Sequence, residues 1–151
     1  MTDKVGGGYL RAIKLEPGET IVRTSDVWHR QARSPRAWSW PPPSFGKLFL
    51  TNTRLLYSPP KQVFLELDRR IAVRHSAISS VAIVANPRTG GAVIAMGRNV
   101  LAWEALRLQI DSQIHWFAMQ HFTQAHRDQL EEWLTMISEA TGLLAEHERG
   151  P

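Results

Sequence analysis

The chain has 151 residues, of which 43% are hydrophobic and 21% charged, and its formal net charge is +4. With six Trp residues this composition is too apolar for an intrinsically disordered chain, and the length suits one domain with an ordinary core. The absence of Cys excludes disulfides, thiolate catalysis and thiolate zinc sites. No apolar run reaches the length of a signal peptide core or a membrane span, so we expect a cytoplasmic protein.

The first part of the chain combines turns with one strand. Residues 1–8 include three consecutive glycines and predict a flexible leader. The segment LEPGET at residues 15–20 predicts a turn, because Pro17 presets φ and Gly18 tolerates a positive φ. A strand is expected from Ile21 to about Trp28. Residues 30–44 (RQARSPRAWSWPPPS) predict a long extended loop, since three consecutive prolines cannot donate strand hydrogen bonds.

Residues 46–57 (GKLFLTNTRLLY) have the pattern of a β-hairpin, with two apolar runs around Thr-Asn-Thr. A two-residue loop of Asn52 and Thr53 would pair Leu50 with Leu55, Phe49 with Leu56, and Leu48 with Tyr57. Because strand side chains alternate between two faces, we expect both faces of this hairpin to be partly buried. Asn52 suits the positive φ of such a loop, whereas Thr53 does not, so a longer loop remains open.

The middle of the chain predicts four more strands. Residues 61–70 carry an apolar patch at 63–65, and residues 70–85 (RIAVRHSAISSVAIVA) predict a short strand, a polar bend and a buried strand near residues 80–85. NPRTGG at residues 86–91 predicts a turn. Two strands follow at about residues 101–111 and 114–121.

The register of this second hairpin can also be predicted. A two-residue turn would oppose Ile110 to Gln113 and mix polar with apolar side chains on each face. A three-residue turn at residues 111–113 opposes Ile110 to Ile114 and places six apolar side chains on one face. Since burial selects register, we predict the three-residue turn.

Residues 123–142 (TQAHRDQLEEWLTMISEATG) predict an amphipathic helix from about residue 124 to 141. Its apolar face comprises Leu130, Trp133, Leu134, Ile137 and Ala140. Gly142 stands where a helix C-cap belongs, and either Thr123 or Asp128 can cap the start. We place Trp133 in the core and expect residues 143–151 to form a frayed tail.

Roughly seven strands followed by one helix is the order of a pleckstrin-homology-like (PH-like) barrel. Four segments agree with it: LEPGETI (15–21), GKLFLTNTRLLY (46–57), RIAVRHSAISSV (70–81) and HRDQLEEWL (126–134). In these the chain resembles the GRAM and bacterial PH-like families over about residues 13–142. The resemblance implies a mainly β domain at residues 9–142, a split barrel of about seven antiparallel strands in two bent sheets, capped by one C-terminal α-helix.

The resemblance also implies a binding module and not an enzyme, since members are associated with phosphoinositide or membrane binding, protein contacts and oligomers. Phosphoinositide-binding members usually place basic residues around the loop between their first two strands. Arg30 and Lys47 can flank that loop here, but Phe49 occupies the position of the next expected basic residue. This departure argues against a stereospecific inositol phosphate pocket.

The loop at residues 30–44 combines Arg with Trp, which is typical of protein hot spots and of membrane-interface anchors. The candidate partner-binding residues are Arg30, Arg33, Arg36, Trp38, Trp40 and Lys47. Alternatively, the two Trp side chains of the loop fold back over the barrel opening as additional core.

No catalytic, cofactor or metal motif stands out. His115, His121 and His126 match no zinc template, and His75 beside Ser76 has no triad context. The glycines at residues 6–8 and 89–91 lack the spacing of phosphate-binding loops. We therefore expect no enzyme activity, no metal and no cofactor.

Together these observations predict a non-catalytic binding or adaptor module that mediates protein association or self-association. The alternative is peripheral binding to anionic membrane lipids through the Arg and Trp loop. We expect no nucleic-acid partner.

Overall fold

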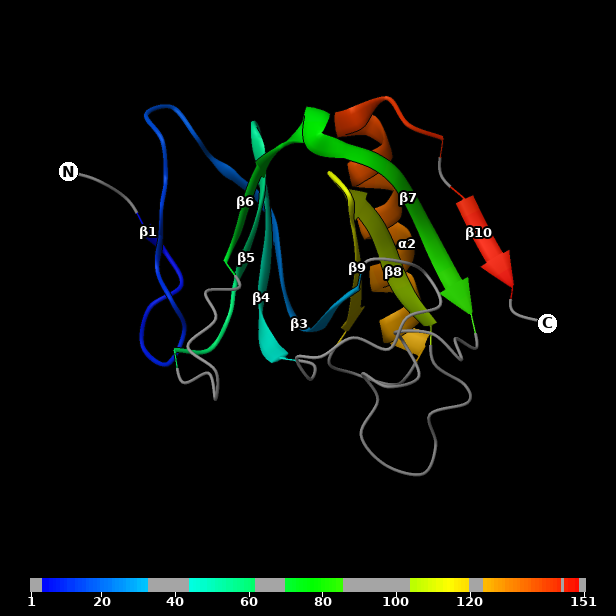
Figure 1. Ribbon diagram of the computed structural model, residues 1–151, viewed down its shortest axis with the longest axis horizontal. Coiled ribbons are helices and arrows are strands. Elements are labelled where there is room, and N and C mark those ends of the chain that lie inside the picture. Colours follow the sequence, from blue (N-terminus) through cyan, green and yellow to red (C-terminus); the bar gives the residue numbers. More distant parts are fainter. Residues whose placement is uncertain are drawn as a thin grey trace.

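The computed structural model describes residues 4–32, 44–61, 70–85, 104–119, 124–144 and 146–149. A small hairpin, β1 (Lys4–Val5) and β2 (Ile13–Lys14), precedes the main sheet (Figure 1). The strands of the main sheet are β3 (Ile21–Ala32), β4 (Ser44–Thr51), β5 (Arg54–Ser58), β6 (Ile71–Arg74), β7 (Ile78–Ala85), β8 (Glu104–Ile110), β9 (Gln113–Met119) and β10 (Glu146–Arg149). The described helical segments are η1 (His75–Ala77) and α2 (Gln124–Thr141).

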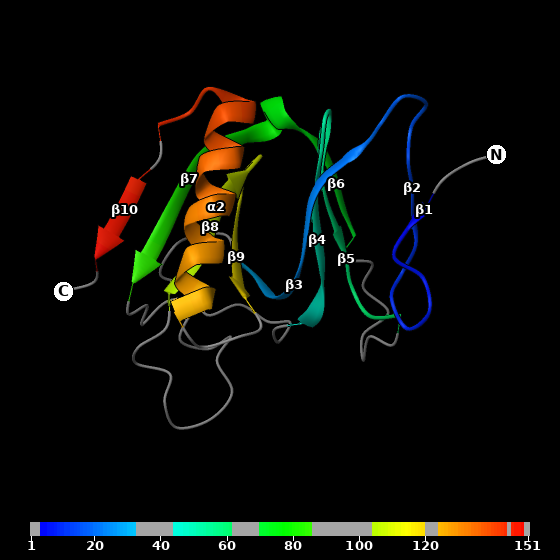
Figure 2. The same ribbon diagram turned by 180° about the vertical axis from the view of Figure 1, so that it is seen from behind.

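The main sheet bends around β3. Its strand order is β10-β7-β8-β9-β3-β4-β5-β6, and β3 pairs with β4 from Ile21 to His29 and with β9 from Val27 to Ala32. The sheet therefore folds into two facing halves, β3–β6 and β7–β9 (Figures 1 and 2). The prediction of seven antiparallel strands and one helix is confirmed. Among the described strands β6 does not pair with β7, so the two halves form one continuous sheet and no closed barrel.

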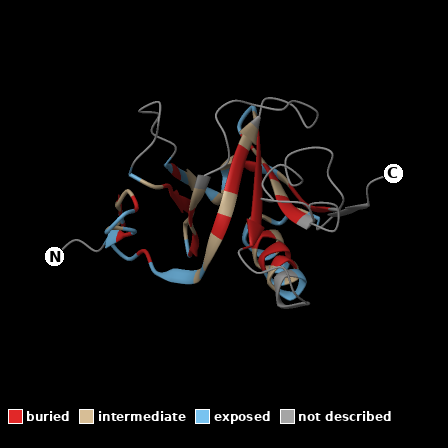
Figure 3. Cartoon of the chain, turned by 90° about the horizontal axis from the view of Figure 1, so that it is seen from below, coloured by how far each residue is buried: buried red, intermediate tan, exposed pale blue. Residues whose placement is uncertain are grey.

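Helix α2 begins and ends where the sequence predicts, at Gln124 and Thr141. Leu130, Trp133, Leu134 and Ile137 are at most 1% exposed and join a core shared by both halves of the sheet. Figure 3 shows the helix buried on this side and exposed on the other. Gly142 takes a φ of 76° and donates its N–H to the Ser138 carbonyl at 2.8 Å, as expected of a C-cap.

Two details of the helix differ from the prediction. Ala140 is exposed, so the apolar face ends one turn earlier, at Ile137. Asp128 lies inside the helix and does not start it, while Thr123 is outside the described residues. The predicted turn at residues 86–91 and the apolar patch at 63–65 are outside them as well.

The first hairpin has the predicted register, with Leu50 paired to Leu55 and Leu48 to Tyr57. One face joins the main core, and the other packs Phe49 against β1 and β2. The two-residue loop is confirmed, but Asn52 does not take a positive φ; among the described non-glycine residues, Asp111 does. The Thr51 hydroxyl closes the loop instead, by accepting the N–H groups of the two residues after Asn52.

The predicted register of the second hairpin is wrong. Ile110 pairs with Gln113, and the two-residue turn between β8 and β9 places Asp111 at a φ of 54°. The prediction assumed a single buried face, whereas both faces are buried here. Leu106, Leu108 and Ile110 face the main core. Ile114, Trp116 and Ala118 form a second cluster on the opposite face with Val84 and Ala105.

Residues at both ends of the chain also differ from the expected leader and frayed tail. Lys4 and Val5 form β1, and Val5 is only 4% exposed. Glu146–Arg149 form β10, which pairs in parallel with β7. These residues therefore form strands and do not belong to a flexible leader or a frayed tail.

A buried ion pair ties the turn at residues 15–20 to the first hairpin. The Glu19 side chain is 1% exposed, and Arg54 donates to its carboxylate from Nε at 2.9 Å and from Nη2 at 2.7 Å. Thr51 Oγ1 donates to the same carboxylate at 2.6 Å. The hydrogen bonds from Arg54 and then Thr51 outweigh desolvation and lower the pKa of Glu19 to about 2.

The first prediction concerns Trp133, whose indole is fully buried and donates to Ser25 Oγ at 2.9 Å. Trp133→Ala should lower the free energy of unfolding by about 3–5 kcal/mol, because it leaves a cavity in the core. Chemical denaturation measures this loss. The exposed substitution Thr135→Ala on the same helix is the control, expected within about 0.5 kcal/mol of wild type. A loss below about 1 kcal/mol for Trp133→Ala would contradict the role of α2 in the core.

The second prediction concerns the buried ion pair. Arg54→Met leaves the Glu19 carboxylate buried without its main donor and should lower the free energy of unfolding by about 3–5 kcal/mol at neutral pH. Replacing both residues, Arg54→Met with Glu19→Met, removes the uncompensated charge and should recover part of that loss. If the double variant is less stable than Arg54→Met alone, the unpaired charge of Glu19 is not the cause of the stability loss in Arg54→Met.

Candidate functional site

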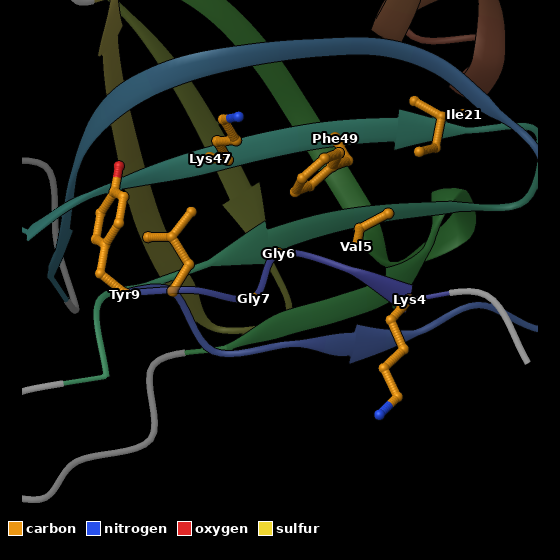
Figure 4. A pocket seen from close by; sticks show the side chains of 9 residues that line it. Lys4, Val5, Gly6, Gly7, Tyr9, Ile21, Lys47 and Phe49 are labelled. Carbon is orange, nitrogen blue, oxygen red and sulfur yellow. The ribbon is translucent and has the colours of Figure 1, made fainter.

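An open cavity of about 300 Å³ lies between the β1–β2 hairpin and the outer face of β3 and β4. It is lined by Lys4, Val5, Gly6, Gly7, Tyr9, Leu10, Ile21, Lys47 and Phe49, and we call it the N-terminal cavity. Figure 4 shows Tyr9 and Ile21 near its two ends, with Phe49 and Val5 between them. The lining therefore combines apolar side chains with polar groups, with a phenol at one end.

The N-terminal segment is held over the sheet by contacts with the end of β5. The Arg11 N–H donates to the Pro59 carbonyl at 2.8 Å, and the Lys61 N–H donates to the Tyr9 carbonyl at 2.8 Å. Gly6 has a φ of 84°, and a Cβ at this position would overlap Ser58 Oγ. A glycine is needed there so that the chain can turn close to β5 and leave the cavity open beside it.

Three large apolar side chains are exposed around this cavity and the adjoining start of β3. Tyr9 is 61% exposed, Ile21 45% and Val22 53%. The β3–β4 register shifts between Ile21 and Arg23, so Val22 has no partner residue on β4. Such a bulge re-aims side chains, and here it leaves two consecutive apolar residues facing solvent. Exposed apolar groups around a cavity are typical of a contact surface.

Two lysines belong to the lining of the cavity, and the Lys4 side chain points away from Val5 and Phe49 (Figure 4). Lys47 is half exposed, and its Nζ lies 4.0 Å from the Asp26 carboxylate, an ion pair that contributes little because both side chains are more than 40% exposed. Lys4 is exposed at the edge of β1. The arrangement can hold an apolar group and attract an acidic one nearby.

Of the residues predicted to bind a partner, Lys47 lines this cavity and Arg30 does not. Arg30 is 8% exposed, and burial lowers the pKa of its guanidinium. Both residues lie on the outer face of the sheet, but the register places Trp28 and Phe45 between them, with ring centroids 4.9 Å apart. Arg33, Arg36, Trp38 and Trp40 lie outside the described residues.

Tyr9 and Ile21 line the cavity but are not predicted as site residues from the sequence. Tyr9 follows three glycines, a pattern that predicts a flexible leader, and Ile21 has the pattern of an ordinary strand residue. The feature that exposes Ile21 is a bulge, which leaves no distinctive pattern in a single sequence. Phe49, which occupies the position of an expected basic residue, is 5% exposed and forms part of the apolar floor.

Comparison with solved structures identifies the fold. The hSac2 domain from the human phosphoinositide phosphatase Sac2 matches this chain with a TM-score of 0.60, at 11% sequence identity, covering 91% of this chain and 81% of that domain. The fold is PH-like. At this identity the likeness shows the fold alone, and it does not single out the GRAM family.

Other comparisons add no family. The C-terminal domain of an unknown protein from Leishmania infantum matches with a TM-score of 0.42, at 16% identity, over 78% of this chain and 87% of that domain, which is too low to support an argument. No family model matches the chain. No curated protein matches it.

Three histidines whose side chains the structure describes are engaged within the PH-like fold. His29 Nε2 and His115 Nδ1 are 2.9 Å apart in the interior, and His75 Nε2 lies 3.1 Å from the Thr51 carbonyl. Among the described residues no group of three or more His, Asp or Glu side chains is arranged to hold a metal ion. His121 lies outside the described residues, and so do the side chains of His126 and His147.

Of the helices in the described part of the chain, none has the length and apolarity needed to cross a membrane.

The third prediction follows from the buried histidine pair. Burial lowers the pKa of His115 from 6.5 to about 4. The unfolded chain therefore binds more protons than the folded chain between these values, and the stability present above pH 6.5 is lost as the pH falls toward 4. Relative to His115→Gln, the wild type should lose about 3 kcal/mol of unfolding free energy across this range.

Denaturant titrations at several pH values measure this difference. His115→Gln is the matched reference because it keeps a hydrogen-bonding side chain but does not titrate there. Parallel pH profiles for the two proteins would contradict a buried neutral His115.

Proposed function

We propose that this protein is a non-catalytic binding module that associates with other protein chains through the N-terminal cavity. The observation that carries the proposal is the cavity floored by apolar side chains, with Tyr9 and Ile21 exposed at its ends and Lys47 beside it. Its occupant would be an extended protein segment with an apolar side chain next to an acidic residue. The PH-like fold is compatible with such a role, since it offers a rigid sheet on which the contact surface is built.

Magnitudes favour a protein over an anionic membrane at this surface. Each basic residue near an anionic bilayer contributes about 1 kcal/mol, so Lys4 and Lys47 together supply about 2 kcal/mol. That is weaker than millimolar binding, which needs about 4 kcal/mol. An aromatic or aliphatic anchor that fills a pocket in a protein interface can contribute about 2 kcal/mol or more by itself.

The fourth prediction tests the occupant. Selection of displayed random peptides against the immobilised wild-type protein should enrich peptides that combine an aromatic or aliphatic residue with Asp or Glu. Ile21→Glu should weaken binding of the enriched peptides by at least about tenfold, which is about 1.4 kcal/mol, because it places a charge in the apolar cavity. Thr135→Glu adds the same charge on the exposed side of α2 and should leave binding unchanged.

Vesicle sedimentation separates the protein role from the lipid role. Phosphatidylcholine vesicles with and without phosphatidylserine are used at low and high ionic strength, because contacts with lipid phosphates weaken with salt. Peptides that bind Ile21→Glu as well as wild type would place the interaction elsewhere. If no peptide motif is enriched and wild type pellets with anionic vesicles at low salt, the membrane function replaces the one proposed.

A further inference from the structure

Strand β7 lies at the edge of the seven-stranded antiparallel sheet, and a short piece of chain covers the second half of the strand there. The four residues of β10 pair in parallel with Ala82–Ala85 of β7, whereas the other ladders of the main sheet are antiparallel. Without β10, a row of N–H and C=O groups on β7 would be open to another strand. This edge lies at the end of the molecule opposite the β1–β2 hairpin (Figure 1).

The two strands differ in how well they suit a sheet. β7 reads ISSVAIVA, with four β-branched aliphatic residues and no charge, and Val81 to Val84 are buried. β10 reads EHER and contains no apolar residue. Parallel pairing is slightly less stable per residue than antiparallel pairing. The parallel ladder of four residue pairs is therefore the attachment of β10 that the structure describes.

The connection to β10 allows it to leave without disturbing the core. Helix α2 ends at Thr141, and Leu143 still packs against the main core. Leu144 is 86% exposed, so the firm attachment of the chain ends one residue earlier. Displacement of β10 therefore costs its own ladder and leaves the packing of α2 in place.

Once uncovered, the edge of β7 is suited to pair with the β7 edge of a second chain. Natural edge strands are protected by charged side chains, by proline or by a covering segment, and β7 has neither charge nor proline. Two uncharged edges related by a two-fold axis are self-complementary and pair antiparallel. Such pairing would join the main sheets of two chains through an edge rich in β-branched residues.

We propose that β10 is a guard strand that masks a self-association edge, and that its displacement lets β7 pair with β7 of a second copy of this chain. This edge is separate from the N-terminal cavity, so the proposal does not depend on the function assigned to the cavity.

The test uses two full-length variants. His147→Pro with Glu148→Pro removes the N–H of two consecutive residues, so that whichever of them points toward β7 is lost. His147→Ala with Glu148→Ala removes the same side chains and keeps both N–H groups. Sedimentation velocity over a wide range of protein concentration gives the mass of each variant, and hydrogen–deuterium exchange reports on the β7 amides.

At high protein concentration the proline variant should have twice the mass of the alanine variant, with β7 amides that become protected as the concentration rises. The α2 amides should stay protected throughout. Equal masses overturn the proposal, whether the β7 amides remain protected or exchange freely. Loss of protection in α2 also overturns it, because a guard strand must be dispensable for the fold.

Discussion

The ion pair between Glu19 and Arg54 is the buried electrostatic link between the turn at residues 15–20 and the first hairpin, which hydrogen bonds between Asn52 and Thr20 also join. Arg54 binds the Glu19 carboxylate with two nitrogens, and its Nη2 also donates to the Lys14 carbonyl at the end of β2, 2.9 Å away. Glu16 extends the network to Arg74 on β6 at 2.7 Å. One guanidinium therefore positions the turn at residues 15–20, the first hairpin and β2. It also places the β1–β2 hairpin where it forms a wall of the N-terminal cavity.

Burial on both faces of the sheet explains where that cavity lies. The main core fills the inner side, and separate clusters cover the outer faces of β4–β5 and of β8–β9. On β4–β5 the cover is the short β1–β2 hairpin, which buries Phe49 and Leu56 but leaves Ile21 exposed. The cavity occupies the margin of this incomplete cover. A contact surface arises there because the apolar outer face extends further than the hairpin that shields it.

The features that could be predicted from the sequence are those encoded by neighbouring residues. The first hairpin, the bend at His75–Ala77 and the bounds of α2 follow from alternation, turn residues and helical spacing. The register of the second hairpin depends on what covers its outer face, and no local pattern reveals that. The candidate site could not be predicted for the same reason, because Tyr9 and Ile21 come to line one cavity only through long-range packing. Lys47 was predicted and does line the cavity, whereas Arg30 is buried.

Strand β3 has a consequence for how the whole molecule melts. Its residues from Val27 to His29 pair with β4 on one side and with β9 on the other. The two halves of the sheet therefore share this strand. Opening one half would strip β3 from the other and expose the shared core beneath α2. We therefore expect the domain to unfold as one cooperative unit and not as two independently melting sheets. For this reason, a partner that binds at the Ile21 end of β3 would stabilise the whole folded domain against unfolding.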